Sequence, residues 1–192
     1  DASAKIKFID SVYKSIDMNK LSTSDEKEDY FLFLGHVSQR QSLQLAKRVT
    51  DKTGNTLVAV LHGERNEKYS RDIETWLEEN NNNLNLQFTD ELSQKTRYNL
   101  YSKAKATFYI SQWEEPLGME MLESLACGTP VIALNKGAVQ EIIEDKKTGF
   151  IVATEEEMIQ AVKNIKQINS ADCRKSAIDN FSSEIIAEKY IS

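Results

Sequence analysis

Six short segments rich in apolar residues recur along this chain, and each is too short to form a helix of ordinary length. Five are continuous apolar runs and one alternates: Tyr30–Leu34, Thr56–Leu61, Leu84–Phe88, Ala106–Ile110, Pro130–Leu134 and Phe150–Val152. Short continuous apolar runs are typical of strands buried in a parallel sheet. Stretches with helical patterning separate these segments, as in chains whose parallel strands are joined by helical crossovers. The sequence therefore predicts an α/β fold, a Rossmann-like parallel sheet of about six strands with helices on both faces.

The stretches between the strands are expected to form the covering helices. They are Ser42–Thr53, Glu67–Asn80, a helix capped by Ser93 that ends near Lys103, a helix that follows Gly118, Val139–Glu144, Glu155–Ile168, and one or two helices within Ala171–Ile191. Residues 1–29 are expected to form an interdomain segment and linker, with a short strand at Ile6, Phe8 and Ile9 and a charged stretch at Thr23–Asp29. Residues 30–192 are the predicted folded domain, because a chain of 192 residues favours a single core.

The charge balance limits the partners that this chain can have. Its 24 basic and 30 acidic residues give a net charge of −6, which argues against nucleic acid or an anionic membrane as the main partner. No apolar run approaches the roughly 18 residues of a membrane span. The two cysteines, Cys127 and Cys173, lack metal-ligand spacing and fit a reducing, cytoplasmic setting. The polar start, without a signal peptide or an initial Met, suggests a fragment of a longer protein.

The loop patterns disfavour three common classes of α/β protein. The loop Gly35–Ser42 has one glycine and lacks the Gly-x-Gly-x-x-Gly that lets a backbone approach a dinucleotide, which argues against a nicotinamide enzyme. The chain contains no Gly-x4-Gly-Lys-Ser/Thr, which argues against a P-loop ATPase. It also contains no Gly-x-Ser-x-Gly, which argues against a serine hydrolase.

One apolar helix carries charge in an unusual place. Glu115 precedes the turn at Pro116 and Gly118 that opens this helix, and Glu123 lies eight residues further on, about two turns deeper. The N-terminus of a helix presents unpaired backbone N–H groups and a partial positive charge, which suit a phosphate. Two carboxylates that flank such a site suit a ligand with hydroxyl groups on either side of a diphosphate. A nucleotide sugar is a ligand of this kind.

The sequence around these glutamates resembles the C-terminal, donor-binding domain of family 4 glycosyltransferases, which have the GT-B fold. The family's mark is a pair of glutamates with seven residues between them, which Glu115 and Glu123 match. The surrounding matches are Glu-Pro-Leu-Gly at residues 115–118, Ala-Cys-Gly-Thr-Pro-Val-Ile-Ala at 126–133, Gly137, Glu141, Ile143-Glu144-Asp145 and Thr148-Gly149-Phe150. Tyr13–Asp17 partly resembles the segment where the family's chain passes from its N-terminal to its C-terminal domain.

This resemblance implies a retaining hexosyltransferase that moves a sugar from a UDP-, GDP- or ADP-linked donor to a glycan or lipid-linked acceptor, as in polysaccharide biosynthesis. In this family the donor phosphate assists deprotonation of the acceptor, so neither a cofactor nor a metal is implied. The acceptor-binding domain is expected to precede residue 1. This piece alone is then expected to bind donor but to transfer poorly, and any peripheral membrane contact is expected only through the missing half.

The resemblance also implies roles for individual residues. Glu115 corresponds to the catalytic-site glutamate near the hydroxyls of the donor sugar, and Glu123 to the glutamate that binds the nucleotide ribose. Backbone N–H groups for the sugar-phosphate are expected from Leu117, Gly118 and Met119. The residues at strand ends where the family holds the base are His62, Gly63, Phe88, Thr89 and Asp90.

The resemblance places four donor-binding residues, expected near the diphosphate, in the loop after the first strand: Gly35, His36, Arg40 and Gln41. This loop nevertheless departs from the family pattern. The family has Gly-Arg-x-x-x-x-Lys-Gly there, and its Arg and Lys hold the donor diphosphate. Aligned on Gly35, the Arg position is His36 and the Lys position is Gln41, so both expected cations are absent. Arg40 is one residue away and can substitute only if the loop is rearranged. His36 is either a phosphate-binding residue or an ordinary loop histidine.

Two hypotheses follow. The first is the donor domain of a glycosyltransferase, which Glu115 and Glu123 favour. The second is a degenerate, non-catalytic module kept for sugar-nucleotide binding, regulation or assembly, which His36 and Gln41 favour.

Three neighbours of the two glutamates are expected to have no role in binding. Glu114 and Glu120 are expected to be solvated charges. Trp113 is expected to pack rather than to form a stacking platform.

Overall fold

The predicted strands form one parallel sheet in the computed structural model, which describes residues 12–24, 26–36, 38–62, 75–76, 84–88 (backbone alone) and 92–191. The strands are β1 (Tyr30–His36), β2 (Thr56–His62), β3 (Leu84–Phe88), β4 (Ala106–Tyr109), β5 (Val131–Leu134) and β6 (Gly149–Val152). Their order is β3-β2-β1-β4-β5-β6, and every neighbouring pair is parallel. The predicted α/β class and the six strands are therefore confirmed.

The strand order reverses between β1 and β4. The chain first builds outward from β1 through β2 to β3, and then returns to add β4, β5 and β6 on the other side of β1. In open parallel sheets, ligands bind outside the carboxyl ends of the strands at such a reversal. A ligand-binding site is therefore expected at the carboxyl ends of β1 and β4.

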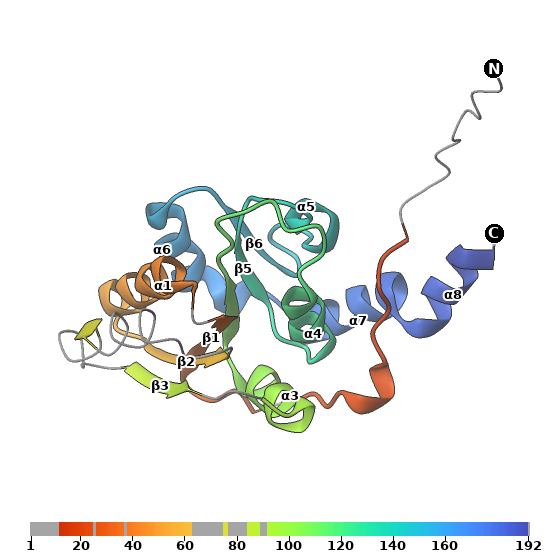
Figure 1. The fold of residues 1–192 in the computed structure, drawn as a ribbon, viewed down its shortest axis with the longest axis horizontal. Coiled ribbons are helices and arrows are strands. Elements are labelled where there is room, and N and C mark those ends of the chain that lie inside the picture. Colours follow the sequence, from red (N-terminus) through yellow and green to blue (C-terminus); the bar gives the residue numbers. More distant parts are fainter. Residues whose placement is uncertain are drawn as a thin grey trace, which may run out of the picture.

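Helices cover both faces of the sheet (Figure 1). On one face α1 (Arg40–Thr53) packs beside α6 (Glu155–Asn164), and on the other α3 (Gln94–Lys103) contacts α4 (Met119–Ala126), which packs on α7 (Ser170–Phe181). The remaining helical segments are η1 (Met18–Lys20), α5 (Val139–Ile142), η2 (Ile165–Gln167) and α8 (Ser183–Ile191). Among the described residues, no helix is long and apolar enough to cross a bilayer.

Two predicted elements fall largely outside the described residues. Of the helix predicted for Glu67–Asn80, only residues 75–76 are described, and both are helical. The strand predicted around Ile6 lies wholly outside the described part of the chain. Both elements stay predictions.

The helix boundaries differ from the prediction where local contacts decide them. α1 begins at Arg40, two residues earlier than predicted, because Gln39 closes a turn by donating its backbone N–H to the His36 carbonyl (2.8 Å). The helix predicted for Glu155–Ile168 ends in the 3-10 segment η2. The C-terminal stretch forms two helices, separated by Ser182 in an extended conformation.

Among these helices, α4 carries a long uninterrupted run of buried residues. All six residues of Met121–Ala126 are buried, including the charged Glu123 and the polar Ser124. The Ser124 hydroxyl lies 2.8 Å from Thr107 Oγ1 on β4 and 3.0 Å from the Thr129 carbonyl oxygen. These hydrogen bonds tie α4 to β4 and to the connection that leads into β5, so its position on the sheet is fixed.

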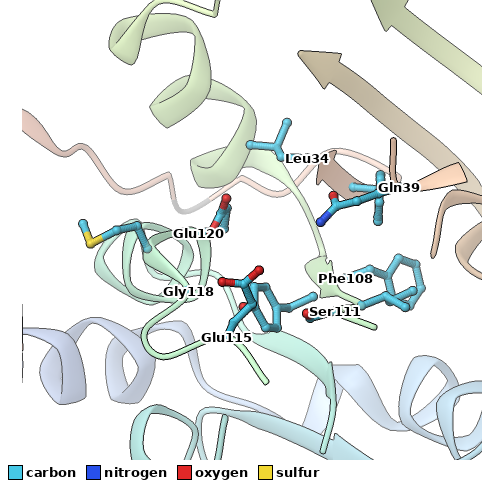
Figure 2. Close-up of a pocket in the computed structure, with 11 residues that line it drawn as sticks. Leu34, Gln39, Phe108, Ser111, Glu115, Gly118 and Glu120 are labelled. Atoms are coloured by element: carbon cyan, nitrogen blue, oxygen red, sulfur yellow. The ribbon is translucent and has the colours of Figure 1, made fainter. Parts of the chain in front are cut away.

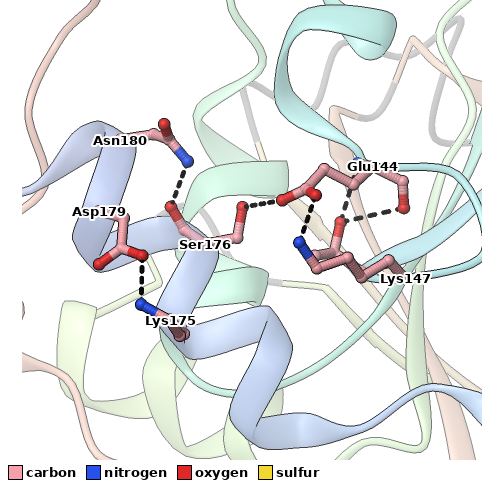
Figure 3. A network of polar contacts seen from close by, with 7 residues as sticks. Glu144, Lys147, Lys175, Ser176, Asp179 and Asn180 are labelled. Atoms are coloured by element: carbon pink, nitrogen blue, oxygen red, sulfur yellow. Dashed lines mark hydrogen bonds and ion pairs between the residues drawn. The ribbon is translucent and has the colours of Figure 1, made fainter.

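A polar network holds α7, which backs α4, against the loop before β6 (Figure 3). Ser176 on α7 donates to Glu144 Oε1 (3.1 Å), and Lys147 Nζ lies 2.6 Å from Glu144 Oε2. The hydrogen bond from Lys147 lowers the pKa of the Glu144 carboxyl below its ordinary value. The Glu144 backbone N–H donates to Thr148 Oγ1 (3.0 Å), which closes the loop.

Part of the predicted interdomain segment packs on the domain. Ile16 is 3% exposed and donates its backbone N–H to the Phe181 carbonyl (2.9 Å). Lys27 Nζ donates to the carbonyls of Ser102 (2.8 Å) and Gly128 (3.2 Å), which lie at the ends of α3 and α4. The segment thus contacts the helices that surround the candidate site. The predicted boundary between residues 29 and 30 stays a prediction.

Replacing Ile16 by Ala is expected to lower the free energy of unfolding by about 2–4 kcal/mol, because the substitution leaves a cavity in the core. The matched control is Ile191→Ala at the end of α8, where the residue is 86% exposed. That control should change the stability by no more than about 0.5 kcal/mol. Urea denaturation followed by circular dichroism measures both. Equally small changes would show that the segment before β1 is only a linker.

Candidate functional site

Two contiguous cavities lie at the carboxyl ends of β1, β2 and β4. The smaller, of about 250 Å³, contains Glu115 and is called the Glu115 lobe; the larger, of about 650 Å³, contains Glu123 and is called the Glu123 lobe. Three residues border both lobes: Leu34, Met119 and Glu120. The two cavities are therefore parts of one site, and they lie where the strand order reverses.

The N-terminus of α4 borders both lobes. Gly118 is the N-cap residue, with a φ of 69° that glycine adopts readily, and within the described structure no side chain caps the helix. A Cβ at this position would lie 2.7 Å from the Tyr109 hydroxyl oxygen and from the terminal methyl of Met121. Of the three predicted backbone donors, Gly118 and Met119 line the Glu115 lobe, whereas Leu117 packs against the core. The helix start offers backbone N–H groups and a partial positive charge to a ligand.

The loop that carries Glu115 is held by the connection between β5 and α5. Gly137, with a φ of 56°, approaches so closely that a Cβ there would lie 2.6 Å from the Glu115 nitrogen. Ala138 donates its backbone N–H to the Glu115 carbonyl (3.0 Å), and Gly137 donates to the Glu114 carboxylate. These contacts fix the backbone of Glu115 at the mouth of its lobe.

A glutamine faces the carboxylates across the Glu115 lobe. Figure 2 shows the half-buried Glu115 and Glu120 side chains on one side of the cavity and the Gln39 amide on the other. Gln39 Oε1 accepts the backbone N–H of His36 (3.0 Å). The side chain folds over Gly35, where a Cβ would lie 2.6 Å from Oε1. The absence of a side chain at Gly35 therefore allows Gln39 to enter the lobe.

The four residues predicted to contact a diphosphate do not gather in either lobe. Gly35 is buried within β1, His36 is exposed at its end, and Arg40 and Gln41 begin α1. None of these four described residues lines the Glu115 or the Glu123 lobe. The His36 ring instead lies edge-on to the His62 ring, with 5.7 Å between the centroids. Contact of this loop with a diphosphate stays a prediction.

Glu123 is buried in the larger lobe and pairs with an arginine of α3. Arg97 Nη2 donates to Glu123 Oε1 (2.7 Å), and 7% of the Glu123 side chain is exposed against 29% of the Arg97 side chain. Burial raises the pKa of Glu123 above its ordinary value, and the charge of Arg97 opposes the rise. His62 also lines this lobe, and burial lowers its pKa. Of the other residues expected to hold the base, three lie outside the described residues: Gly63, Thr89 and Asp90.

Two expectations about the neighbours of Glu115 are wrong. Trp113 is 62% exposed rather than packed, because hydrogen bonds of its backbone N–H and carbonyl to Ser111 Oγ form a tight turn at the protein surface. Glu120 is half-buried and borders both lobes, because it lies in the first turn of α4. Glu114 is exposed, as expected.

The groups in the two lobes suit a ligand that carries hydroxyl groups on either side of an anionic group. Each lobe offers a carboxylate that can accept hydrogen bonds from hydroxyl groups, and the start of α4 between them can bind an anion.

Within the described part of the chain, no three His, Cys, Asp or Glu side chains gather as metal ligands do. Cys127 and Cys173 are buried and free, and burial raises the pKa of each thiol to about 12.

This fold is that of the Rossmann-like halves of GT-B glycosyltransferases. Residues 16–181 match the family described as glycosyl transferases group 1, and the chain belongs to that family. A probable sucrose-phosphate synthase of Thermosipho melanesiensis is 31% identical to it over 98 residues, which cover 50% of this chain and 23% of the synthase.

Solved structures confirm the fold. AviGT4, a glycosyltransferase involved in avilamycin A biosynthesis, matches with a TM-score of 0.77 and 22% identity over 94% of this chain and 56% of that chain. HepE of Anabaena in complex with UDP and glucose matches with a TM-score of 0.72 and 15% identity over 94% of this chain and 55% of HepE. The chain thus spans about half the length of these two proteins.

Replacing Gly137 by Ala is expected to lower the free energy of unfolding by about 2–4 kcal/mol, because a Cβ would both strain the backbone and collide with the Glu115 loop. The control is Gly54→Ala at the end of α1, where φ is also positive (69°) but no atom lies within 4 Å of the added Cβ. Strain alone should cost about 1–2 kcal/mol there. Urea denaturation of both variants measures the difference, and equal losses would contradict the close contact between Gly137 and Glu115.

Proposed function

We propose that this chain is the C-terminal, donor-binding domain of a retaining, family 4 hexosyltransferase. Its donor is a nucleotide-diphosphate sugar and its acceptor a glycan or a lipid-linked glycan. The observation that carries the proposal is the placement of Glu115 and Glu123, each in its own lobe beside the start of α4. Family membership and the likeness to HepE with UDP and glucose support it. A cytoplasmic location is part of the proposal, supported by the two free thiols.

The shapes of the lobes suggest how the donor lies. The larger Glu123 lobe suits the nucleoside, and the smaller Glu115 lobe suits the hexose. The diphosphate then lies over the start of α4, near Gly118. Glu115 accepts hydrogen bonds from sugar hydroxyls, and Glu123 accepts them from the ribose.

In the proposed reaction the acceptor hydroxyl attacks the anomeric carbon on the face from which the diphosphate leaves. The bond between the anomeric carbon and the phosphate oxygen breaks while the bond to the acceptor oxygen forms. The acceptor proton passes to the departing phosphate oxygen. The domain contributes electrostatic stabilisation, because the dipole and N–H groups of α4 face the charge that develops on the diphosphate. Binding of the acceptor is assigned to the remainder of a longer protein.

The two glutamates are expected to act on different halves of the donor. Glu123→Gln should weaken binding of the nucleoside diphosphate by about 10–100-fold, because a hydrogen bond to a charged group contributes about 1.5–3 kcal/mol. Glu115→Gln should leave the binding of the nucleoside diphosphate unchanged. It should remove the affinity that the nucleotide sugar gains over the nucleoside diphosphate through its sugar. Calorimetric titration with UDP, GDP and ADP and with their sugars measures both effects and identifies the base.

The matched control for these titrations is Glu184→Gln, an exposed glutamate of α8. This variant should bind every ligand as the wild type does. Failure of the folded wild type to bind any of the nucleotides would refute the donor-site proposal.

A degenerate, non-catalytic module is the second candidate. The observation that favours it is the position of His36 and Gln41, which are exposed and line neither lobe, at the loop where the family has its diphosphate-binding cations. Such a module binds sugar nucleotides or partner subunits without transferring sugar. Transferase assays of the longer protein with the identified donor distinguish the two candidates, because only the first predicts turnover.

The double substitution His36→Arg with Gln41→Lys is expected to tighten nucleotide-sugar binding about tenfold or more, because each restored charge-assisted hydrogen bond contributes about 1.5–3 kcal/mol. The control adds the same charge away from the lobes, as Gln160→Lys with Gln167→Lys at the exposed side of α6 and η2. Calorimetry at two salt concentrations separates contact from long-range attraction. A gain no larger than that of the control would overturn the alignment of this loop with the family.

A further inference from the structure

Arg97 stands out in the Glu123 lobe, because it is the only lysine or arginine among the described residues that line it. Its partner, Glu123, is the residue that the proposed function assigns to the ribose. The two side chains come from different helices, α3 and α4, and their contact of 2.7 Å is typical of a charge-assisted hydrogen bond. In the surface pair of Arg48 and Glu155, by contrast, 53% of the arginine side chain is exposed.

The charge of Arg97 favours the ionised form of Glu123. Burial favours the neutral acid and raises the pKa of the Glu123 carboxyl, whereas the positive charge of Arg97 favours the carboxylate. Glu120, one turn earlier on α4, adds a negative charge and works against ionisation. The other titratable groups around the lobe are uncharged near neutral pH: Tyr98, Tyr101, Cys127 and His62.

The geometry also leaves one carboxylate oxygen for a ligand. Arg97 engages Oε1, and no donor among the described residues engages Oε2. A guanidinium is planar and rigid, so its hydrogen bond to Oε1 restricts rotation of the carboxylate. An oriented carboxylate whose Oε2 has no donor among the described residues is suited to accept a hydrogen bond from a ribose hydroxyl.

We propose that Arg97 is a positioning residue for the nucleotide: it orients Glu123 toward the ribose and keeps it in the carboxylate form. This inference rests on the proposed function, because it requires that the Glu123 lobe takes the nucleoside. A merely structural pair would stabilise the contact between α3 and α4 and leave ligand binding unchanged. Buried ion pairs often add little net stability over apolar replacements, so stability alone does not account for the pair.

The test compares Arg97→Met and Arg97→Lys with the wild type in calorimetric titrations with UDP, GDP and ADP between about pH 5 and 8. Arg97→Met should weaken binding of the preferred nucleotide about 10–100-fold at neutral pH. Binding is tighter to the carboxylate form, so affinity is lost as the pH falls through the pKa of Glu123. Because Arg97→Met raises that pKa, the loss should occur at a higher pH in this variant. Arg97→Lys should show the pH profile of the wild type, because the positive charge remains. It should keep only part of the wild-type affinity, because an ammonium group does not orient the Glu123 carboxylate as a planar guanidinium does.

A second measurement does not depend on any ligand. Carbon NMR of the glutamate carboxyl groups should show the titration midpoint of Glu123 about 1–3 pH units higher in Arg97→Met than in the wild type. The matched control is Arg48→Met, which removes an arginine from the surface pair with Glu155 on the other face of the sheet. It should change neither the midpoint nor nucleotide binding.

The outcomes separate this inference from the proposed function. If the folded wild type binds none of the nucleotides, the proposed function fails and the role of Arg97 fails with it. If the wild type binds but Arg97→Met shows the same affinity, pH profile and carboxyl midpoint, only the role of Arg97 is refuted. A lower urea midpoint in Arg97→Met with unchanged binding would identify the pair as structural and would also refute the proposal.

Discussion

The burial of α4 is the constraint on which the rest of the site depends. Its residues Met121–Ala126 are enclosed between the sheet and α7, and protein interiors are packed too densely for such a helix to shift without opening voids. The hydrogen bonds of the Ser124 hydroxyl to Thr107 and Thr129 also fix the position of α4 along its own axis. The N-terminus of α4 is thereby held at the carboxyl edge of the sheet. The fixed position of α4 also fixes the separation between Glu115, which precedes this helix, and Glu123, which lies on it.

The same burial places a carboxylate where an uncompensated charge is unfavourable. An isolated buried acid takes up a proton rather than remain charged in an apolar surrounding. The pairing of Glu123 with Arg97 offsets this cost and leaves part of the carboxylate facing the lobe. The site thus combines a densely packed helix with a buried, charge-compensated carboxylate, Glu123, in its larger lobe.

The fold could be predicted from the sequence because its signals are local. Each of the six apolar segments is short, and each is separated from the next by a helix or a turn, so the alternation alone indicates a parallel sheet. The site is partly local as well: Glu115, Gly118 and Glu123 lie on one helix and its entrance, and their spacing is visible in the chain.

The rest of the site depends on contacts between segments far apart in the sequence. Gln39 enters the Glu115 lobe only because β1 and α1 meet in a tight turn over Gly35. Arg97 lies 26 residues before Glu123, and nothing in its local sequence distinguishes it from a solvated helical charge. The exposure of Trp113 follows from hydrogen bonds of its backbone to Ser111 Oγ rather than from its apolar side chain. Tertiary packing determines these features, so local patterns in a single sequence do not predict them.

The two lobes share a border of Leu34, Met119 and Glu120, yet each has a carboxylate of its own. If the donor lies as proposed, the walls of the smaller lobe select the sugar and those of the larger lobe select the base. A substitution in the wall of one lobe then changes the preference for the sugar or for the base and leaves the other preference unchanged. The shared border keeps the sugar and the nucleoside in the same relative position. A lineage built on this site can therefore exchange its sugar and its nucleotide in separate evolutionary steps.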